Sequence, residues 1–234
     1  MSKKERILRL SALILCEIFT VATIAMVIAK NQTPRLLMAG ATLLLVLIPA
    51  FCEKAFRFKI SLPIYLLSLF YAIGPMLGQC YELYYTLNWW DKLLHALGGV
   101  MFALVGLFLF HRFSEKDHKQ VVMAAVFALC FSMAISVLWE FCEFGADTFF
   151  GMDMQQDTLI TGFHSYLLGS ETGVTGALEG ISEVFVNGQA LPGYIDIGLH
   201  DTMMDMLLET IGAAAVAVFH LVSKGKYSVF QASP

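Results

Sequence analysis

The chain has 234 residues, of which 58% are hydrophobic and only 15% are charged, and its mean hydropathy is +0.70. This composition excludes an ordinary soluble domain, so the lipid bilayer must form part of the solvent around the protein. The formal net charge of −4 gives no reason to expect a nucleic-acid partner.

Six apolar runs reach or approach the roughly 20 residues that a helix needs to cross the hydrocarbon core of a membrane. They cover residues 8–29, 36–51, 60–78, 91–110, 121–144 and 200–222. The sequence therefore predicts an all-α fold, a polytopic bundle of about six transmembrane helices. We expect these helices to form one integral membrane domain over residues 1–234.

Positive charges alternate between the segments that connect these runs. Four segments are rich in Lys and Arg: those before the first run, between the second and third, between the fourth and fifth, and after the sixth. Their basic residues are Lys3, Lys4, Arg6, Arg9, Lys54, Arg57, Lys59, Arg112, Lys116, Lys119, Lys224 and Lys226. Because the positive-inside rule places such segments in the cytoplasm, we expect both termini there.

The segment 145–199 is then a long acidic loop outside the membrane. It holds no Lys or Arg, is rich in Gly, and contains a predicted short helix near residues 175–185. Loops longer than about 15 residues in compact proteins are usually functional or disordered. A lid or a substrate-binding element is therefore one interpretation of this loop.

The fourth run begins with an acidic residue and a histidine on one helix face. Asp91 and His95 are spaced at i and i+4, directly after an aromatic stretch, residues 81–90, that is typical of a membrane interface. Asp91 can also be interpreted as a helix N-cap, and His95 as a packing histidine. Gly98 and Gly99 follow, and they permit close approach of another helix backbone.

The fifth run ends in three acids that share a face. Glu140, Glu143 and Asp147 are spaced at i, i+3 and i+7. A helix C-terminus is electronegative, so neither capping nor the helix dipole explains acids at this end. These residues therefore indicate a function more strongly than Asp91 does.

The sixth run begins with a second acidic stripe. Asp201, Asp205 and Glu209 follow His200 at i, i+4 and i+8, and Gly212 lies one turn deeper. Glu209 lies about two turns into the membrane, where an acid needs a partner, a proton or a water-filled cavity.

The acidic stripes need neutralisation that ordinary salt bridges cannot supply. Residues 121–223 contain twelve Asp or Glu and no Lys or Arg, and Lys92 is the nearest fixed positive charge. Protonated carboxyls, a bound cation, or a proton or ion path would each meet this need. Carboxylates with imidazoles suit Mg²⁺, Ca²⁺ or Mn²⁺, and Zn²⁺ or Fe²⁺ if both histidines are ligands.

The candidate site follows from these stripes. We expect the three helix ends to converge within about 5 Å, an ordinary distance for coupling between charges. The predicted metal ligands are Asp91, His95, Glu140, Glu143, Asp201 and Asp205. Glu209 and Asp147 are the candidate catalytic bases, and Lys92 and His200 are accessory residues.

Four motifs resemble a known family. They are Asp91-Lys92-x-x-His95, Trp139-Glu140-x-x-Glu143, the segment 150–155, and Asp201-Thr202-Met203-Met204-Asp205. Together they resemble the YjdF-type family of uncharacterised bacterial membrane proteins and, more distantly, VanZ-type proteins. The resemblance implies a multi-pass protein of the bacterial plasma membrane, and its VanZ-like side implies cell-envelope biology.

Three functions remain open from the sequence. The first is a metal-dependent enzyme that acts on a lipid-linked or cell-envelope substrate at the outer face. The second is a non-catalytic binding or scaffold protein whose acids recognise a cationic ligand. The third is a proton- or cation-coupled transporter with Glu209, Glu140 and His95 as a relay, although the sixth run is apolar from Gly212 to His220. We expect membrane lipid as a partner in each case.

Overall fold

A computed structural model of the chain describes residues 2–114, 120–226 and 230–232. Two residues that contributed to the predicted orientation, Lys116 and Lys119, lie outside these ranges. Six helical segments are long and apolar enough to cross a membrane: Lys3–Ala29, Thr33–Ala55, Leu62–Cys80, Trp90–Phe113, Val121–Phe150 and Leu199–Val222. The predicted polytopic helical class is confirmed, whereas the predicted location of the termini stays a prediction.

The chain divides into two compact units, which are described separately. The first comprises residues 1–135 and 208–234, and the second comprises residues 136–207. Helices α7 (Val121–Phe150) and α8 (Leu199–Val222) are each continuous and contribute residues to both units. The single domain expected from the sequence stays a prediction.

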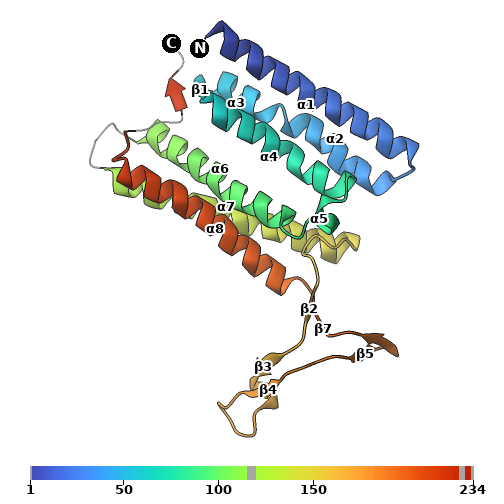
Figure 1. The fold of residues 1–234 in the computed structure, drawn as a ribbon. Helices are drawn as coiled ribbons and strands as arrows, with labels where there is room; N and C mark the ends of the chain where they lie inside the picture. The colour runs from blue at the N-terminus through green and yellow to red at the C-terminus, as the bar shows by residue number, and fades with distance from the viewer. Residues whose placement is uncertain (1, 115–119, 227–229, 233–234) are drawn as a thin grey trace. The chain divides into compact units, whose positions relative to one another are not determined.

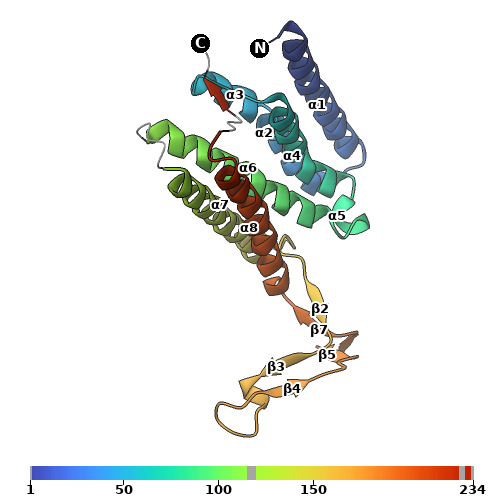
Figure 2. The ribbon, with the colours of Figure 1, turned by 60° about the vertical axis from the view of Figure 1, so that its left-hand side comes forward.

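In the first unit, three membrane segments pack side by side (Figures 1 and 2). They are α1 (Lys3–Ala29), the segment from η1 (Thr33–Arg35) through α2 (Leu36–Leu45) to α3 (Ile48–Ala55), and α4 (Leu62–Cys80). The predicted run over 36–51 lies within the candidate span Thr33–Ala55, in which a turn at Val46–Leu47 separates α2 from α3. Pro49, which has no N–H, lies in the first turn of α3, where no intrahelical donor is needed.

A buried ion-pair network joins these segments near the N-terminus. Arg9 Nη1 lies 2.6 Å from Glu53 Oε1, and the guanidinium also donates to the carbonyl of Ile60. Lys59 Nζ and the Ile60 amide each lie 2.8 Å from the Glu53 carboxylate. Strand β1 (Phe58–Ile60), which carries Lys59 and Ile60, pairs antiparallel with β8 (Phe230–Ala232) (Figure 1).

In the rest of the first unit, the helices pack against one another through small residues. A short helix, α5 (Leu83–Thr86), leads into α6 (Trp90–Phe113). Ala103, Ala128 and Ala213 form a tightly packed core between α6, α7 and α8. Ser132 Oγ donates to the carbonyl oxygen of Gly99 at 3.2 Å, which joins α7 to α6. Small side chains of this kind let membrane helices approach closely.

The second unit contains a segment of short strands. α7 continues to Phe150, five residues beyond the predicted start of the loop at 145. The antiparallel pairs are β2 (Thr158–Ile160) with β7 (Tyr194–Asp196), β3 (Phe163–Ser165) with β4 (Gly176–Leu178), and β5 (Val184–Val186) with β6 (Gln189–Leu191). The short 3-10 helix η3 (Tyr166–Leu168) follows β3. The predicted helix near 175–185 was therefore wrong.

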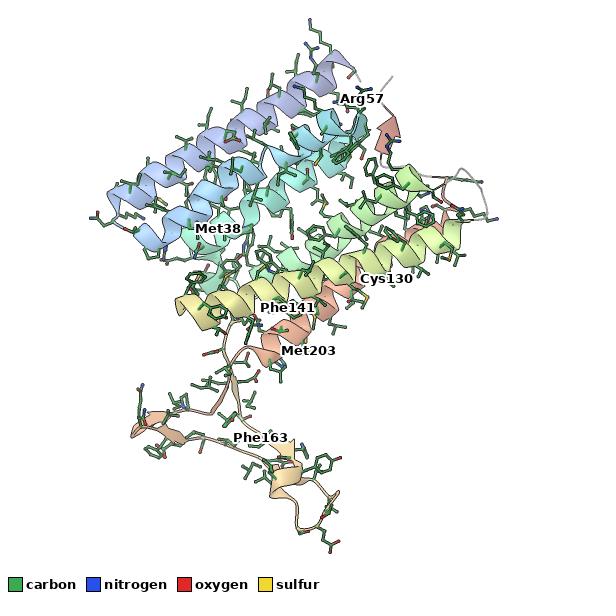
Figure 3. All side chains as sticks on the ribbon, turned by 180° about the vertical axis from the view of Figure 1, so that it is seen from behind. Met38, Arg57, Cys130, Phe141, Phe163 and Met203 are labelled. Carbon is green, nitrogen blue, oxygen red and sulfur yellow. The ribbon has the colours of Figure 1, made fainter. Side chains whose placement is uncertain are left out.

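The turn between β5 and β6 explains that error. Asn187 and Gly188 have φ of 49° and 81°, the conformation of a type I′ turn, for which Asn-Gly is the preferred pair. This dipeptide stands between two short apolar runs, a pattern typical of a hairpin, which sequence reasoning missed. In Figure 3, Phe163 marks strand β3 of the same segment.

Candidate functional site

In the first unit, His95 lies between carboxylates from two helices. Its Nε2 is 3.7 Å from Asp91 Oδ1, and its Nδ1 is 4.0 Å from Glu209 Oε2. Only 8% of the His95 side chain and 5% of the Glu209 side chain are exposed. Lys92 Nζ lies 3.2 Å from Asp91 Oδ2. Asp91, Lys92, His95 and Glu209 thus form a largely buried polar group at the start of α6.

Two glycines bring Glu209 to His95. A Cβ added to Gly99 would collide with the carbonyl oxygen of Glu209, and one added to Gly212 would collide with the carbonyl oxygen of Ala96. The backbones of α6 and α8 therefore touch one turn from the His95–Glu209 pair. The prediction that these glycines allow close helix approach is confirmed.

Tyr71 is a member of this polar group that sequence reasoning missed. It lies on α4, and a Cβ added to Gly98 would be only 2.9 Å from its hydroxyl oxygen. The Tyr71 hydroxyl is close enough to Glu209 for the two groups to interact. Gly98 thus leaves room for a phenol that can donate a hydrogen bond. The third apolar run also contains Tyr65, and no sequence pattern links Tyr71 to Glu209.

On α8, the acids form one buried face. Asp201, Asp205 and Glu209 are 6%, 0% and 4% exposed, whereas Met203 and Leu207 between them are more than half exposed. Figure 3 shows Met203 projecting from α8. Exposed apolar side chains on a membrane helix face lipid, so the acids occupy the side turned away from it.

On α7, the buried and exposed faces alternate in the same way. Glu140 and Glu143 are 4% and 6% exposed, and Phe141 between them is largely exposed (Figure 3). Trp139 Nε1 donates to Glu143 Oε1 at 2.8 Å. This bond orients the carboxylate of Glu143. Trp139 is a second functional residue whose role the sequence did not indicate.

Asp147 holds the segment that follows α7. Its two carboxylate oxygens accept hydrogen bonds from the backbone amides of Met154 and Gln155, at 2.6 and 2.8 Å. The Gln155 side chain donates to Thr202 Oγ1 at 2.6 Å, which fixes the same segment to the start of α8. These bonds support a structural role for Asp147, and its role as a catalytic base stays a prediction.

Asp201 and His200 also take part in local structure at the start of α8. The amide of Gln156 donates to Asp201 Oδ2 at 3.0 Å. The amide of His200 donates to Asp196 Oδ2 at 2.6 Å, and the His200 side chain is exposed. An accessory role for the imidazole of His200 therefore remains a prediction.

Asp153 lies in the segment between these anchors. Burial raises the pKa of its carboxyl, and the negative charge of Asp157 raises it further. A hydrogen bond from the Asp157 amide opposes the shift, and the charges of Asp147 and Asp201 add to it. The acids of this segment are therefore close enough to influence one another.

Buried carboxylates thus occur in both units, whereas the buried histidines of the described residues, His95 and His220, belong to the first. Side chains that could serve as metal ligands are Asp91, His95 and Glu209 in the first unit, and Glu140, Glu143, Asp201 and Asp205 in the second. The predicted ligand set stays a prediction. Oxygen donors with a single imidazole suit Mg²⁺, Mn²⁺ or Ca²⁺ better than a soft metal ion.

Comparison with known proteins places the chain in a family. Residues 11–226 match the family model described as "Predicted membrane protein (DUF2238)", which covers most of the chain. The chain belongs to the DUF2238 family. No curated protein and no solved structure matches it. Within DUF2238, the protein is a multi-pass membrane protein with buried histidine and carboxylate groups.

Proposed function

We propose that this DUF2238 protein binds a divalent cation through His95 and acids of α6, α7 and α8, and that the cation serves a reaction on a lipid-linked or cell-envelope substrate. The proposed ligands are drawn from Asp91, His95, Glu140, Glu143, Asp201 and Asp205.

The observation that carries the proposal is the position of His95. The imidazole of His95 is more than nine-tenths buried, and a carboxylate flanks each of its nitrogens, Asp91 beside Nε2 and Glu209 beside Nδ1. Carboxylates beside a ligating histidine orient its ring and raise its basicity. Mg²⁺, Mn²⁺ or Ca²⁺ balances the carboxylates that no Lys or Arg on α7 or α8 can neutralise. Glu209, next to Tyr71, is the group placed to act as a general base.

The proposal also covers the cellular location of the protein and its resemblance to YjdF-type and VanZ-type proteins. We place the cation at the outer face of a bacterial plasma membrane, in keeping with the positive charges in the first turns of α1 and after α8. Membership in DUF2238 is compatible with the YjdF-type and VanZ-like resemblance of the motifs. A role in the cell envelope follows from that resemblance.

Close packing disfavours the transporter alternative. α6 and α8 touch at Gly99 and Gly212, about one turn from Glu209 in the direction of His220. A methyl group would not fit at this contact. A proton or ion path toward His220 needs polar groups or water at that point. The scaffold alternative shares the cation site, and it differs from the enzyme only in having no turnover.

Metal analysis tests the site. Protein purified without a polyhistidine tag is equilibrated with Mg²⁺, Mn²⁺, Ca²⁺ or Zn²⁺ and assayed by mass spectrometry and calorimetry. We expect one tightly bound divalent ion, and a loss of affinity of about tenfold or more in Asp205→Asn and Glu140→Gln. Glu179→Gln, which removes an exposed acid of the second unit, is the control and keeps the ion. Absence of a stoichiometric ion in the unaltered protein excludes the site.

Turnover separates the enzyme from the scaffold. Proteoliposomes are incubated with a polyprenyl-diphosphate lipid as the probe, with and without the divalent ion. If the protein is an enzyme of this kind, we expect metal-dependent release of phosphate. Asp205→Asn should abolish this release, and the control variant Glu179→Gln should keep it. Metal binding without conversion of this probe would favour the scaffold.

A further inference from the structure

A second pair of imidazoles lies at the other ends of α6 and α8. His111 is in the last turn of α6, and His220 is in the last turn of α8. Both belong to the first unit, and their ring centroids are 5.5 Å apart with the ring planes at 69°. The two helix ends lie side by side in Figures 1 and 2. This pair is separate from the carboxylates around His95.

The tautomer of His111 follows from its hydrogen bond. His111 Nδ1 lies 2.7 Å from the carbonyl oxygen of Leu107. A carbonyl only accepts, so Nδ1 carries the proton and the lone pair of the neutral ring lies on Nε2. Histidines that bind metal ions commonly make such a bond through the other nitrogen, which fixes the ring.

His220 presents a nitrogen without a partner. The residue is only 4% exposed, and within residues 2–114, 120–226 and 230–232 its buried Nε2 has no hydrogen-bond partner. Burying a polar nitrogen without a partner costs free energy. Gly225 lies in the turn after α8 with φ of 67°, and its Cβ would be 3.7 Å from this nitrogen. Glycine at this position therefore leaves that side of Nε2 without a side chain.

The spacing of the rings matches two imidazoles on one ion. With a zinc–nitrogen bond of about 2.0 Å, the ion lies about 3.2 Å from each ring centroid, so a tetrahedral angle separates the centroids by about 5.2 Å. The observed centroid separation is 5.5 Å. We propose that Nε2 of His111 and Nε2 of His220 form a second metal site, for a Zn²⁺- or Cu²⁺-class ion whose remaining positions are taken by water. Imidazole pairs prefer such ions to Mg²⁺ or Ca²⁺.

Electron paramagnetic resonance with Cu²⁺ tests this site. One equivalent of Cu²⁺ is added to protein without a polyhistidine tag, and coupling to imidazole nitrogens is recorded. We expect two equivalent nitrogens in the unaltered protein and stoichiometric displacement by Zn²⁺. His111→Ala and His220→Ala each lose the two-nitrogen signal, and His164→Ala, which removes an exposed histidine on β3, keeps it.

The outcomes separate this site from the carboxylate site. Glu143→Gln leaves the two-nitrogen signal intact, whatever it does to Mg²⁺ or Mn²⁺ binding. If His220→Ala does not fold, His111→Ala decides, because the His111 side chain is exposed and its loss leaves no cavity in the core. An unchanged signal in His111→Ala overturns the proposal. So does Cu²⁺ that binds only in large excess, without resolved nitrogen coupling, as an adventitious ion would.

Discussion

A Cβ on Gly99 would occupy the space of the carbonyl oxygen of Glu209. The acid that lies beside His95 is therefore presented by a direct contact between two helix backbones, and the contact depends on the absence of a side chain. Gly212 makes the reciprocal contact with Ala96 on α6. Helix packing and the polar group at the start of α6 are therefore inseparable.

Gly99→Ala is expected to force α6 and α8 apart. Overpacking of a tight contact typically costs about 1–3 kcal/mol. We expect a lower thermal midpoint in detergent and a weaker affinity for the divalent ion. Gly40→Ala is the matched control, because nothing lies within 4 Å of a Cβ added there. Equal midpoints for the two variants would contradict the packing described for Gly99.

Arg9→Met is expected to destabilise the first unit strongly. Arg9 and Glu53 are each 7% exposed, and removing one member of a buried pair typically costs about 3–5 kcal/mol. Lys59 is 41% exposed, so Lys59→Met is expected to cost less than about 1 kcal/mol. Unfolding in denaturant measures both variants. The double variant Arg9→Met/Glu53→Met should recover part of the loss, and a further loss instead would contradict the pairing.

Asp147→Ala is expected to release the segment after α7. It removes the acceptor of the Met154 and Gln155 amides. Hydrogen exchange of residues 151–157 should accelerate at least about tenfold, since each lost bond is worth about 1 kcal/mol or more. Asp147→Asn keeps one acceptor oxygen and should show an intermediate rate. If exchange is unchanged while turnover is lost, Asp147 acts as a base and not as an anchor.

Asp153 is expected to make the stability of the second unit depend on pH. Its pKa is raised by burial and by Asp157, so the folded state binds its proton more tightly than the unfolded state. Stability therefore falls as pH rises from the ordinary pKa of an aspartate through the raised value, and the cost is complete above it. We expect Asp153→Asn to be more stable than the unaltered protein at neutral pH.

The same difference should vanish in acid, where Asp153 is protonated in both states. Thermal unfolding of the two proteins at a series of pH values measures it. Asp157→Asn should reduce the pH dependence, because it removes the second cause of the shift. A difference that is constant with pH would contradict the assignment to Asp153.

The orientation of the chain is tested by labelling intact cells. Lys54 lies on α3, and Leu167 lies in η3 and is 95% exposed. In a background without native cysteines, an impermeant maleimide should label Leu167→Cys and not Lys54→Cys. The opposite pattern would place the acidic ends of α7 and α8 at the cytoplasmic face and exclude an extracytoplasmic substrate.

The sequence indicates helices well where burial in lipid sets the pattern. The lengths of the apolar runs alone located α1, α4, α6 and α8, and most of the ends of these helices lie within a few residues of the predicted positions. It missed the break between α2 and α3, because apolar residues continue through the turn at Val46–Leu47. It also missed the hairpins of residues 158–196, where the strands are three residues long and too short for an alternating pattern.

Some parts of the candidate site could likewise be predicted from the sequence, and others could not. Helical spacing identified the acidic faces of α7 and α8, because a stripe on one helix is a local property. Tyr71 and the His111–His220 pair depend on contacts between residues far apart in the chain, and nothing in their sequence surroundings points to those contacts. Long-range packing of that kind leaves no periodic signal in a single sequence.

The acidic segment between α7 and α8 also determines which reagents can report on it. Trypsin cuts after Lys and Arg, so it leaves everything between Lys119 and Lys224 as one large, apolar peptide. Amine-reactive cross-linkers find no side chain to modify in the same stretch. A binding partner of this segment would escape routine proteomic surveys, and carboxyl-directed coupling with a chymotrypsin-type digest is the chemistry that would reveal it.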